Sequence, residues 1–216
     1  MVRIEIFLFC IFAARFIKEM IYQLDTLFMD RDGVVNKQIV GGYVQHISQF
    51  VFLDQVAEAL QILHKKFVRI VLVTNQQGVG KGLCSMEDVE QVHEYMQSQL
   101  RTRGCAFDKI YCCPHLAAEN CTCRKPKPGM AFQAQKDFPD IDFSRSLMVG
   151  DSLSDIQFAK YAGIPAVHVG AIRHPEFEEI QKITPHHFDS LYDFALAMER
   201  GEYPIVGIKK QDDLSK

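Results

Sequence analysis

The chain alternates short, almost continuously apolar runs with longer segments of helical spacing, and this alternation limits the folds open to it. The run Val68 to Val73 is rich in β-branched residues and apolar nearly throughout, which is typical of a strand buried on both faces. Four further runs have strand length: Thr26 to Met29, Lys109 to Cys112, Ser146 to Gly150 and Ala166 to Val169. Because helical segments separate these runs, the order predicts a parallel sheet with helices on both faces, a three-layer Rossmann-like α/β fold.

The helical segments carry start and stop signals. Val56, Leu60 and Leu63 follow helical spacing in a segment that extends to about residue 65. Ser85, followed closely by two acidic residues, predicts the N-cap of a helix that continues to about residue 101. We expect further helices after 128–129, over 155–161 with Gly163 past its end, and over 188–198.

A single domain over residues 21–200 is the expected organisation, because 216 residues supply one good core and leave little room for a second. Residues 1–20 are predicted to be an N-terminal extension. Its apolar run, Ile6 to Phe12, is shorter than the about 20 residues that a membrane-spanning helix needs. Three interpretations of the extension stay open: translation begins at Met20, the segment packs as an extra helix, or it is a targeting segment. Residues 201–216 are expected to be a loosely held C-terminal tail.

The charge balance narrows the range of partners. The formal net charge is −3, whereas a general nucleic-acid surface usually shows a basic excess. The hydrophobic fraction of 48% is that of an ordinary soluble globular protein. We therefore expect a monomer with no nucleic-acid partner and no membrane partner.

Seven cysteines are present, and four of them fall between residues 112 and 123. Cys113-x-His115 and Cys121-x-Cys123, separated by five residues, form two equally spaced pairs of soft ligands. Four protein ligands leave no open coordination position, so this pattern predicts a structural zinc ion. Cys112 is an alternative to Cys113 as the first ligand. Clustered free thiols indicate a reducing compartment, so we expect a cytoplasmic protein.

Polar residues follow three of the predicted strands at the point where each strand ends. Asp30 and Asp32 come after the first strand, Thr74 and Asn75 after the second, and Asp151 after the fourth. The carboxyl ends of parallel strands meet at one sheet edge, where ligands bind in open α/β folds. Two carboxylates held close together repel each other, and a bound cation relieves that repulsion. Because magnesium prefers oxygen ligands, Asp30, Asp32 and Asp151 predict a Mg²⁺ site.

The same edge carries the groups that phosphoryl transfer requires. An aspartate such as Asp30 can attack phosphorus and form an aspartyl-phosphate. Asp32 can protonate the departing alkoxide and then accept a proton from the attacking water. Thr74 and Lys125 can supply a hydroxyl and an ammonium that stabilise charge on the transferring group. The pattern indicates hydrolysis of a small phosphorylated substrate.

Four polar segments follow one another along the chain: Asp30-Arg31-Asp32-Gly33-Val34, Thr74-Asn75-Gln76, Arg124-Lys125-Pro126 and Gly150-Asp151-Ser152-x-x-Asp155. In this order they match the motifs of haloacid dehalogenase-type phosphatases, which the chain resembles from about residue 24 to residue 170. The resemblance implies that Asp30 is the nucleophile and Asp32 the acid and base, with Thr74 and Lys125 on the phosphoryl group. It also implies that Asp30, the Asp32 backbone carbonyl and Asp151 hold magnesium. Asp155 is expected either to support this site or to cap its own helix.

The cysteine pattern runs directly into Arg124-Lys125-Pro126. This combination resembles the branch of that family that contains heptose-bisphosphate and histidinol-phosphate phosphatases. The resemblance implies that a large cap domain is lacking and that the zinc loop helps to shape the substrate site. Residues 41–44 and 47–52 resemble the heptose-bisphosphate type, whereas the five-residue spacing in the zinc loop resembles the histidinol-phosphate type. We expect a heptose bisphosphate as the substrate and keep histidinol phosphate as the alternative. A polynucleotide phosphatase and a noncatalytic zinc-binding module fit the charge and the motifs less well.

Substrate contacts are expected from residues in and beside these motifs. The candidates are Arg31, Gly42, Tyr43, Asn75, Gln76, Gln77, Arg124 and Ser152. Residues 77–82 are glycine-rich but lack the ending and spacing of a P-loop, so we expect a flexible loop at the rim of the site. His93 has no ligand partner at a suitable spacing and is expected to be a structural or surface residue.

Overall fold

The structure, a computed structural model, describes residues 24–171 and 176–203. The N-terminal extension predicted over residues 1–20 lies outside these ranges, as does the predicted tail beyond residue 203. None of the helices within the described ranges has the length and apolar character needed to span a bilayer.

Six parallel strands form one sheet in the order β3-β2-β1-β4-β5-β6. Their bounds are β1 Leu24–Met29, β2 Phe67–Asn75, β3 Lys109–Cys113, β4 Leu147–Gly150, β5 Ala166–Val169 and β6 His187–Phe188. The five strands predicted from the sequence all occur within one or two residues of their expected positions. The predicted α/β class is confirmed.

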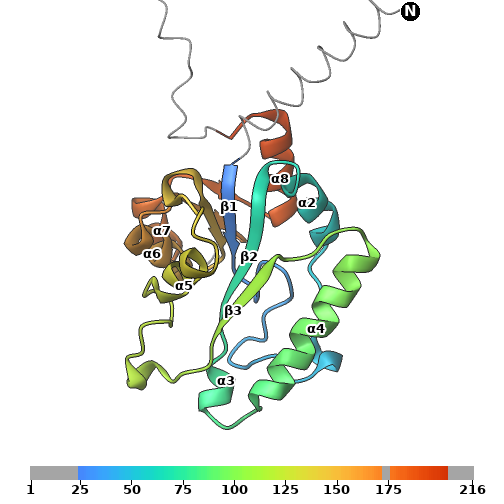
Figure 1. The fold of residues 1–216 in the computed structure, drawn as a ribbon, viewed down its shortest axis with the longest axis vertical. Helices are drawn as coiled ribbons and strands as arrows, with labels where there is room; N and C mark the ends of the chain where they lie inside the picture. The colour runs from blue at the N-terminus through green and yellow to red at the C-terminus, as the bar shows by residue number, and fades with distance from the viewer. Residues whose placement is uncertain (1–23, 172–175, 204–216) are drawn as a thin grey trace, which may run out of the picture.

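Helices cover both faces of this sheet (Figure 1). Their bounds are α2 Val56–Leu63, α3 Gln77–Gly80, α4 Met86–Thr102, α5 Gly129–Asp137, α6 Leu153–Ala162, α7 Phe177–Ile183 and α8 Leu191–Arg200. Short 3-10 helices occur at Ile47–Gln49, Ala117–Glu119 and Phe143–Arg145. In Figure 1, α5, α6 and α7 lie on one side of the sheet and α2, α4 and α8 on the other.

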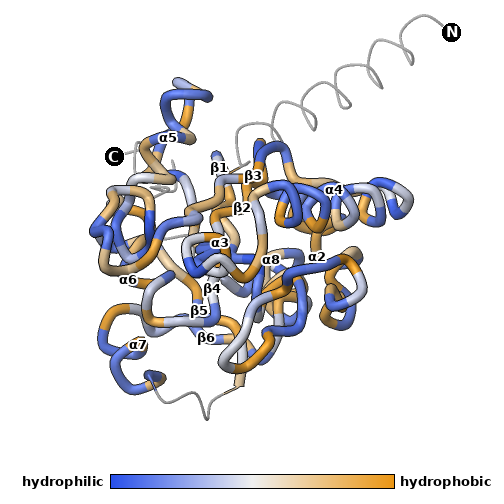
Figure 2. The backbone as a smooth tube through the Cα atoms, turned by 90° about the horizontal axis from the view of Figure 1, so that it is seen from below, coloured by the Kyte–Doolittle hydropathy of each residue, from blue (hydrophilic) through white to orange (hydrophobic). Residues whose placement is uncertain are grey.

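Alternation along the buried strands produces two hydrophobic cores, one on each face of the sheet. Leu27 and Met29 of β1 pack into the core that includes Leu60 of α2 and Phe194 of α8. Phe28, between them, points to the opposite core, with side chains from α5 and α6. Hydrophilic and hydrophobic residues alternate along the surrounding helices, α4 among them, as one-sided burial requires (Figure 2).

The predicted helix boundary signals have their expected geometry. The hydroxyl of Ser85 accepts a hydrogen bond from Asp88 N at 3.0 Å, and the Asp88 carboxylate accepts one from Ser85 N at 2.7 Å. This reciprocal pair is a capping box, which satisfies backbone N–H groups at the start of α4. At the end of α6, Gly163 adopts a φ of 73°, a left-handed conformation that glycine reaches without steric cost.

Three local features differ from the sequence prediction. The closing helix was expected to include Phe188, but this residue belongs to β6 and α8 begins at Leu191. Residues 177–183 form a helix that was not predicted, and Gln77–Gly80 form one helical turn within the segment expected to be a loop. A two-residue strand and a single helical turn are too short to show a hydrophobic period, so the sequence pattern carried no signal for them.

Candidate active site and metal sites

The motif residues converge at the carboxyl edge of the sheet. Asp30 directly follows β1, Thr74 is the next-to-last residue of β2, Asp151 directly follows β4, and Lys125 comes from the loop before α5. They surround a cavity of about 220 Å³. Its lining residues are Asp30, Asp32, Gln38, Ile39, Gly42, Tyr43, Thr74, Asn75, Lys125, Asp151, Ser152 and Ser154.

A buried ion-pair network forms the floor of this cavity. The Lys125 ammonium lies 2.6 Å from a carboxylate oxygen of Asp30 and 2.6 Å from one of Asp155. Burial alone would lower the pKa of Lys125, but the two carboxylates outweigh burial and raise it, so the side chain stays cationic. The ammonium therefore fixes the rotation of the Asp30 carboxylate.

Asn75 clamps the backbone of Lys125. Its side-chain oxygen accepts a hydrogen bond from Lys125 N at 3.0 Å, and its amide nitrogen donates to Lys125 O at 3.1 Å. The lysine ammonium also donates to Val73 O at 2.8 Å. Because Val73 and Asn75 both belong to β2, the end of this strand determines where the lysine lies.

Asp155 has both of the roles that the sequence left open. One carboxylate oxygen accepts hydrogen bonds from Ser152 N at 3.1 Å and Ser152 Oγ at 2.6 Å, which caps α6. The other oxygen pairs with Lys125. Gly150 provides the space for this arrangement, since a Cβ atom there would lie 2.2 Å from Cβ of Asp155.

Three carboxylates, from Asp30, Asp151 and Asp155, bring oxygen atoms within 4.8 Å of one another. Burial, followed by repulsion from Asp155, raises the pKa of Asp30 to about 7. Burial, followed by repulsion from Asp30, raises the pKa of Asp151 to about 8. One lysine does not balance three carboxylates, so these oxygen ligands fit a divalent cation such as Mg²⁺.

Gly33 gives the Asp151 carboxylate its place. A Cβ atom on Gly33 would lie 1.9 Å from Oδ2 of Asp151, and the glycine has a φ of 92°. Both the close approach and the positive φ exclude an ordinary side chain at this position. These two features explain why the sequence motif has a glycine directly after Asp32.

Asp32 is held as an ionised carboxylate by four hydrogen bonds. Arg31 donates to both of its oxygens at 3.0 and 2.9 Å, Asn36 donates to one at 2.9 Å, and Gln76 donates to the other at 2.8 Å. Burial would raise the pKa of Asp32, but the charge of Arg31 and these hydrogen bonds together lower it.

Arg31 and Gln76 support Asp32 from behind and do not line the cavity. The Arg31 side chain is fully buried, and its Nη1 lies 3.0 Å from Nε2 of His93 on α4. Burial, followed by the charge of Arg31, lowers the pKa of His93 to about 3, so the neutral ring can accept this hydrogen bond. His93 is thus a buried structural residue. The structure places Arg31 and Gln76 behind Asp32, and their contact with substrate stays a prediction.

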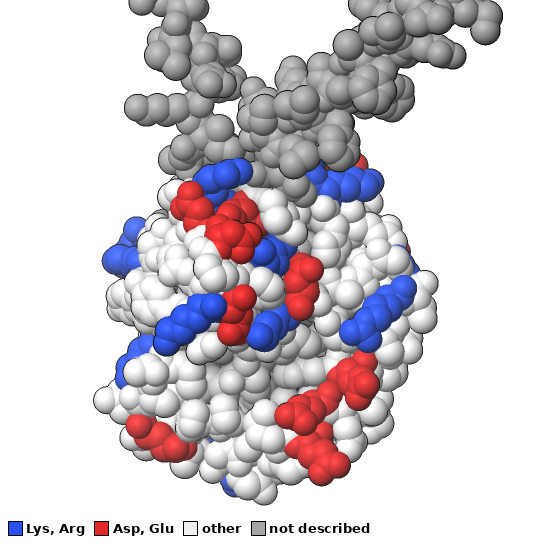
Figure 3. All heavy atoms as spheres, viewed as in Figure 1, with Lys and Arg blue, Asp and Glu red and all other residues white. Residues whose placement is uncertain are grey.

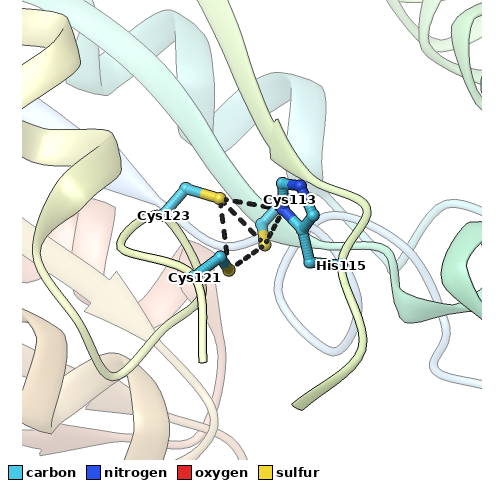
Figure 4. Close-up of side chains that lie close together, drawn as sticks. All are labelled: Cys113, His115, Cys121 and Cys123. Carbon is cyan, nitrogen blue, oxygen red and sulfur yellow. Dashed lines mark hydrogen bonds between the residues drawn. The ribbon is translucent and has the colours of Figure 1, made fainter. Parts of the chain in front are cut away.

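The four predicted zinc ligands point toward one another (Figure 4). Sγ of Cys113 lies 3.6 Å from Nδ1 of His115 and 3.6 Å from Sγ of Cys121. Sγ of Cys123 lies 3.2 Å from Cys113, 3.5 Å from Cys121 and 3.3 Å from the His115 ring nitrogen. A zinc tetrahedron with Zn–S bonds of about 2.3 Å has edges of about 3.7 Å, so the cluster fits zinc closely. Cys113, and not Cys112, belongs to this cluster.

Comparison with known proteins agrees with this geometry. A family model described as HAD-hydrolase-like matches residues 122–194. A Mycobacterium bovis relative named D-glycero-alpha-D-manno-heptose-1,7-bisphosphate 7-phosphatase is 42% identical over 183 residues, which cover 82% of this chain and 93% of the relative. The chain belongs to the haloacid dehalogenase-like phosphatase family. The predicted class of enzyme, a phosphoric monoester hydrolase, is confirmed.

Other members of this phosphatase family match over similar lengths. A Photorhabdus laumondii relative named D-glycero-beta-D-manno-heptose-1,7-bisphosphate 7-phosphatase is 38% identical and covers 87% of this chain and 98% of its own. A crystal structure of D,D-heptose 1,7-bisphosphate phosphatase from B. bronchiseptica, complexed with magnesium and phosphate, has a TM-score of 0.72 at 27% identity. It covers 82% of this chain and 99% of that one.

The remaining predicted contacts of this phosphatase divide into two groups. Gly42, Tyr43, Asn75 and Ser152 line the cavity, whereas Gln77 and Arg124 are not among its lining residues. One guanidinium nitrogen of Arg124, Nη1, is buried and has no hydrogen-bond partner among the described residues, which suits an anionic ligand. Gln38, Ile39 and Ser154 also line the cavity and were not predicted. Gln38 and Ile39 lie in an irregular loop, where no periodic pattern in the sequence predicts which way a side chain points.

The glycine-rich segment 77–82 packs against the cysteine loop, the segment from Cys113 to Cys123, and contains no phosphate-binding motif. Gly80 N donates to Pro114 O at 3.0 Å, and a Cβ atom on Gly80 would lie 2.9 Å from that oxygen. Glycine at this position therefore allows the backbone of α3 to contact the cysteine loop.

A second cavity of about 580 Å³ lies at the opposite, amino edge of the sheet. Its walls are mainly apolar and include Leu24, Leu147, Ile164 and Ala166. Although it is larger, it contains none of the motif residues. The carboxylates and Lys125 that can carry out the reaction line the smaller cavity. The smaller cavity is therefore the candidate active site of this phosphatase.

Proposed function

We propose that the protein removes the phosphate at position 7 of D-glycero-D-manno-heptose 1,7-bisphosphate through an aspartyl-phosphate on Asp30. The observation that carries this proposal is the buried Asp30–Lys125 pair, which lies beside Asp151 in a polar cavity. Relatives that are 38 to 42% identical, over most of their own length, have names that specify this substrate and this reaction.

In the first step, an Asp30 carboxylate oxygen attacks phosphorus and the bond from phosphorus to the sugar oxygen breaks. Lys125 restrains the Asp30 carboxylate, while Lys125 and Thr74 stabilise negative charge on the transferring group. Asp32 donates a proton to the departing sugar oxygen. Because Asp32 rests as a carboxylate with a lowered pKa, it must first take up a proton from solvent. The negative charge of the bound dianionic phosphate favours this protonation, since it raises the pKa of Asp32 against the effect of Arg31.

In the second step, water attacks the phosphorus of the aspartyl-phosphate. Asp32, again a carboxylate, accepts the proton of this water, and the bond from phosphorus to Asp30 breaks with return of the electron pair to the carboxylate. The four hydrogen bonds keep Asp32 ionised, so its carboxylate is free of a proton when this water attacks.

We propose two metal ions with different roles. Magnesium held by Asp30, Asp151 and the Asp32 backbone carbonyl would supply positive charge to the phosphoryl oxygens. Zinc held by Cys113, His115, Cys121 and Cys123 would fix the loop that leads into Arg124 and Lys125. Free thiols in the cysteine cluster favour a reducing compartment, and we propose that the enzyme acts in the cytoplasm as a monomer.

The charged groups on the face shown in Figure 3 are of mixed sign, with Lys and Arg interspersed among Asp and Glu. A surface of this kind offers little to a polyanionic nucleic acid, which binds through clusters of positive charge. A small phosphorylated sugar, bound through the groups lining a cavity, is therefore the substrate class that we propose.

A panel of phosphate esters tests the proposed substrate. It contains both anomers of the heptose bisphosphate, histidinol phosphate and a 3′-phosphorylated oligonucleotide, each assayed with magnesium. We expect kcat/KM for one heptose anomer to exceed that for histidinol phosphate by at least about 100-fold. An equal or higher value for histidinol phosphate would replace the proposed substrate with the alternative. The Asp30→Asn variant controls for contaminating phosphatase.

A further inference from the structure

Two histidines connect the edge of the sheet to the candidate magnesium site. His168 of β5 is 1% exposed, and its Nε2 lies 3.0 Å from the backbone oxygen of Asp151. Its other ring nitrogen, Nδ1, lies 2.8 Å from Nδ1 of His187 in β6. The two rings are nearly parallel, with an interplanar angle of 20°. None of the four sequence motifs includes either histidine.

The chemistry of these contacts assigns the hydrogens. A carbonyl oxygen only accepts, so Nε2 of His168 carries a hydrogen and donates it to Asp151 O. A neutral His168 then has a lone pair on Nδ1, and Nδ1 of His187 donates to it. The second nitrogen of His187, Nε2, is buried without a hydrogen-bond partner among the described residues, and a carboxylate oxygen of Asp189 lies 3.7 Å from it. Because Nδ1 of His187 donates to Nδ1 of His168, His187 selects the tautomer in which His168 donates to Asp151.

Neighbouring groups fix both rings in place. Phe177 makes T-shaped contacts with both rings, with centroid distances of 5.7 Å to His168 and 4.8 Å to His187. The two histidines are also register partners across the β5–β6 pair. Rings held in this way give the hydrogen bond to Asp151 O a defined direction.

Asp151 lies where β4 ends and α6 has not yet begun, so the sheet ladder does not fix its carbonyl group. The orientation of this carbonyl sets the backbone torsion of Asp151. Its carboxylate must meet Asp30 in the space left by Gly33. A small rotation of this peptide would therefore move a predicted metal ligand.

We infer that His168 is a positioning residue for the magnesium ligand Asp151, with His187 holding His168 in the donating tautomer. The inference rests on the proposed function only through the magnesium site, and it does not depend on which sugar phosphate is the substrate. Groups that orient a metal ligand by hydrogen bonding contribute to metal affinity, and their loss costs about 10- to 100-fold.

Three variants separate positioning from packing. His168→Phe keeps the ring shape and removes the donor. His168→Gln places an amide N–H near the former Nε2 and so keeps the donor to Asp151. His187→Phe removes the group that selects the tautomer. Mg²⁺ affinity is measured by isothermal titration calorimetry without substrate, and thermal unfolding and zinc content report on the fold.

We expect His168→Phe to weaken Mg²⁺ binding about 10- to 100-fold, with kcat at saturating Mg²⁺ within about threefold of the wild-type value. His168→Gln should recover Mg²⁺ affinity to within about threefold of wild type, and His187→Phe should lie between the two. A folded His168→Phe protein with unchanged Mg²⁺ affinity would overturn the inference. It would also be overturned if His168→Gln bound Mg²⁺ as weakly as His168→Phe, since the donor would then be irrelevant.

The results can distinguish a failure of this inference from a failure of the proposed function. Weakened Mg²⁺ binding in His168→Phe supports the positioning role even when the substrate panel rejects heptose bisphosphate. Wild-type protein that binds no Mg²⁺ would overturn both. A transition-metal ion that binds wild-type protein in addition to zinc, and is lost in His187→Phe, would assign the histidine pair to a metal and overturn the hydrogen bond from His187 to His168.

Discussion

The two predicted metal sites differ in what their ligands do without a metal. At the sheet edge, Asp30 and Asp151 have pKa values raised to about 7 and about 8, mainly by burial and then by repulsion between neighbouring carboxylates. In the cysteine loop, thiols and one imidazole can share hydrogens at distances of 3.2 to 3.6 Å.

The two sites therefore differ in how unfavourable their metal-free state is. The carboxylates repel one another until a proton or a cation arrives, so their site is poised to bind charge. The loop cluster has four ligands that would close around an ion and leave no position for substrate. The first site should therefore respond to pH and to magnesium, and the second should respond to loss of a ligand. Four predictions test this contrast, beginning with the largest expected effect.

Asp30→Asn should lower kcat by about 10⁴-fold or more, because the amide cannot form the phosphoenzyme intermediate. Turnover of the best substrate in the panel measures the loss. Zinc content by elemental analysis should stay at the wild-type value, since Asp30 lies outside the cysteine cluster. Activity retained within tenfold of wild type would remove Asp30 from the nucleophile role.

Cys121→Ser should remove zinc and lower kcat/KM by about 100-fold, because the loop that positions Arg124 and Lys125 loses its metal. Elemental analysis and turnover are measured on the same preparation. Cys112→Ser is the matched control, since Cys112 neighbours the cluster in sequence but is not part of it. A zinc-free Cys121→Ser protein with normal turnover would contradict the structural role of this ion.

Gly33→Ala should weaken Mg²⁺ binding by at least about tenfold, since the new methyl group would meet Oδ2 of Asp151. Calorimetric titration measures the affinity. Gly104→Ala controls for backbone strain, because Gly104 has a φ of 73° with nothing within 4 Å of its Cβ position. Equal losses of affinity in the two variants would reject the steric explanation.

Without magnesium, the protein should become less stable as the pH rises from about 4 to about 8. Asp30 and Asp151 have native pKa values of about 7 and about 8, well above the ordinary aspartate value of 3.8. Over this window the native state therefore holds protons that the unfolded state has released, and stability falls as the pH increases. Added Mg²⁺ should remove most of this fall by replacing the protons.

Thermal unfolding at several pH values, with and without Mg²⁺, measures this effect. Asp151→Asn isolates the contribution of one carboxylate and should give a shallower decline. A thermal midpoint that rises between pH 5 and pH 8 in magnesium-free wild-type protein would show that the two carboxylates are not protonated in the native state.

The sequence predicted the parts of the site that depend on where residues stand along the chain relative to the strands. Motif residues at strand ends were assigned correctly to one edge, because parallel strands share that edge. The equal spacing of the two ligand pairs favoured Cys113 over Cys112, and alternation along β3 gives the reason. Adjacent strand residues point to opposite faces, so only one of these two thiols can face the loop cluster.

Sequence reasoning did not anticipate contacts whose partners come from distant elements. Arg31 and Gln76 belong to the motifs, but the sequence carried no sign that His93 on α4 and the Asp32 carboxylate hold their side chains inside. His168 lacked any local signal because its partner is on β6, a strand too short to be predicted. The Asp155–Lys125 pair likewise joins two motifs that only the fold brings together.

The pair of hydrogen bonds between Asn75 and the backbone of Lys125 has a consequence for changes in loop length. One end of the cysteine loop leaves β3 at Cys113, and the other end is tied to β2 by Asn75. The stretch between His115 and Cys121 is thus anchored at both sides, and its length can change without displacing the lysine. Insertions there would leave the position of Lys125, and with it the reaction chemistry, unchanged.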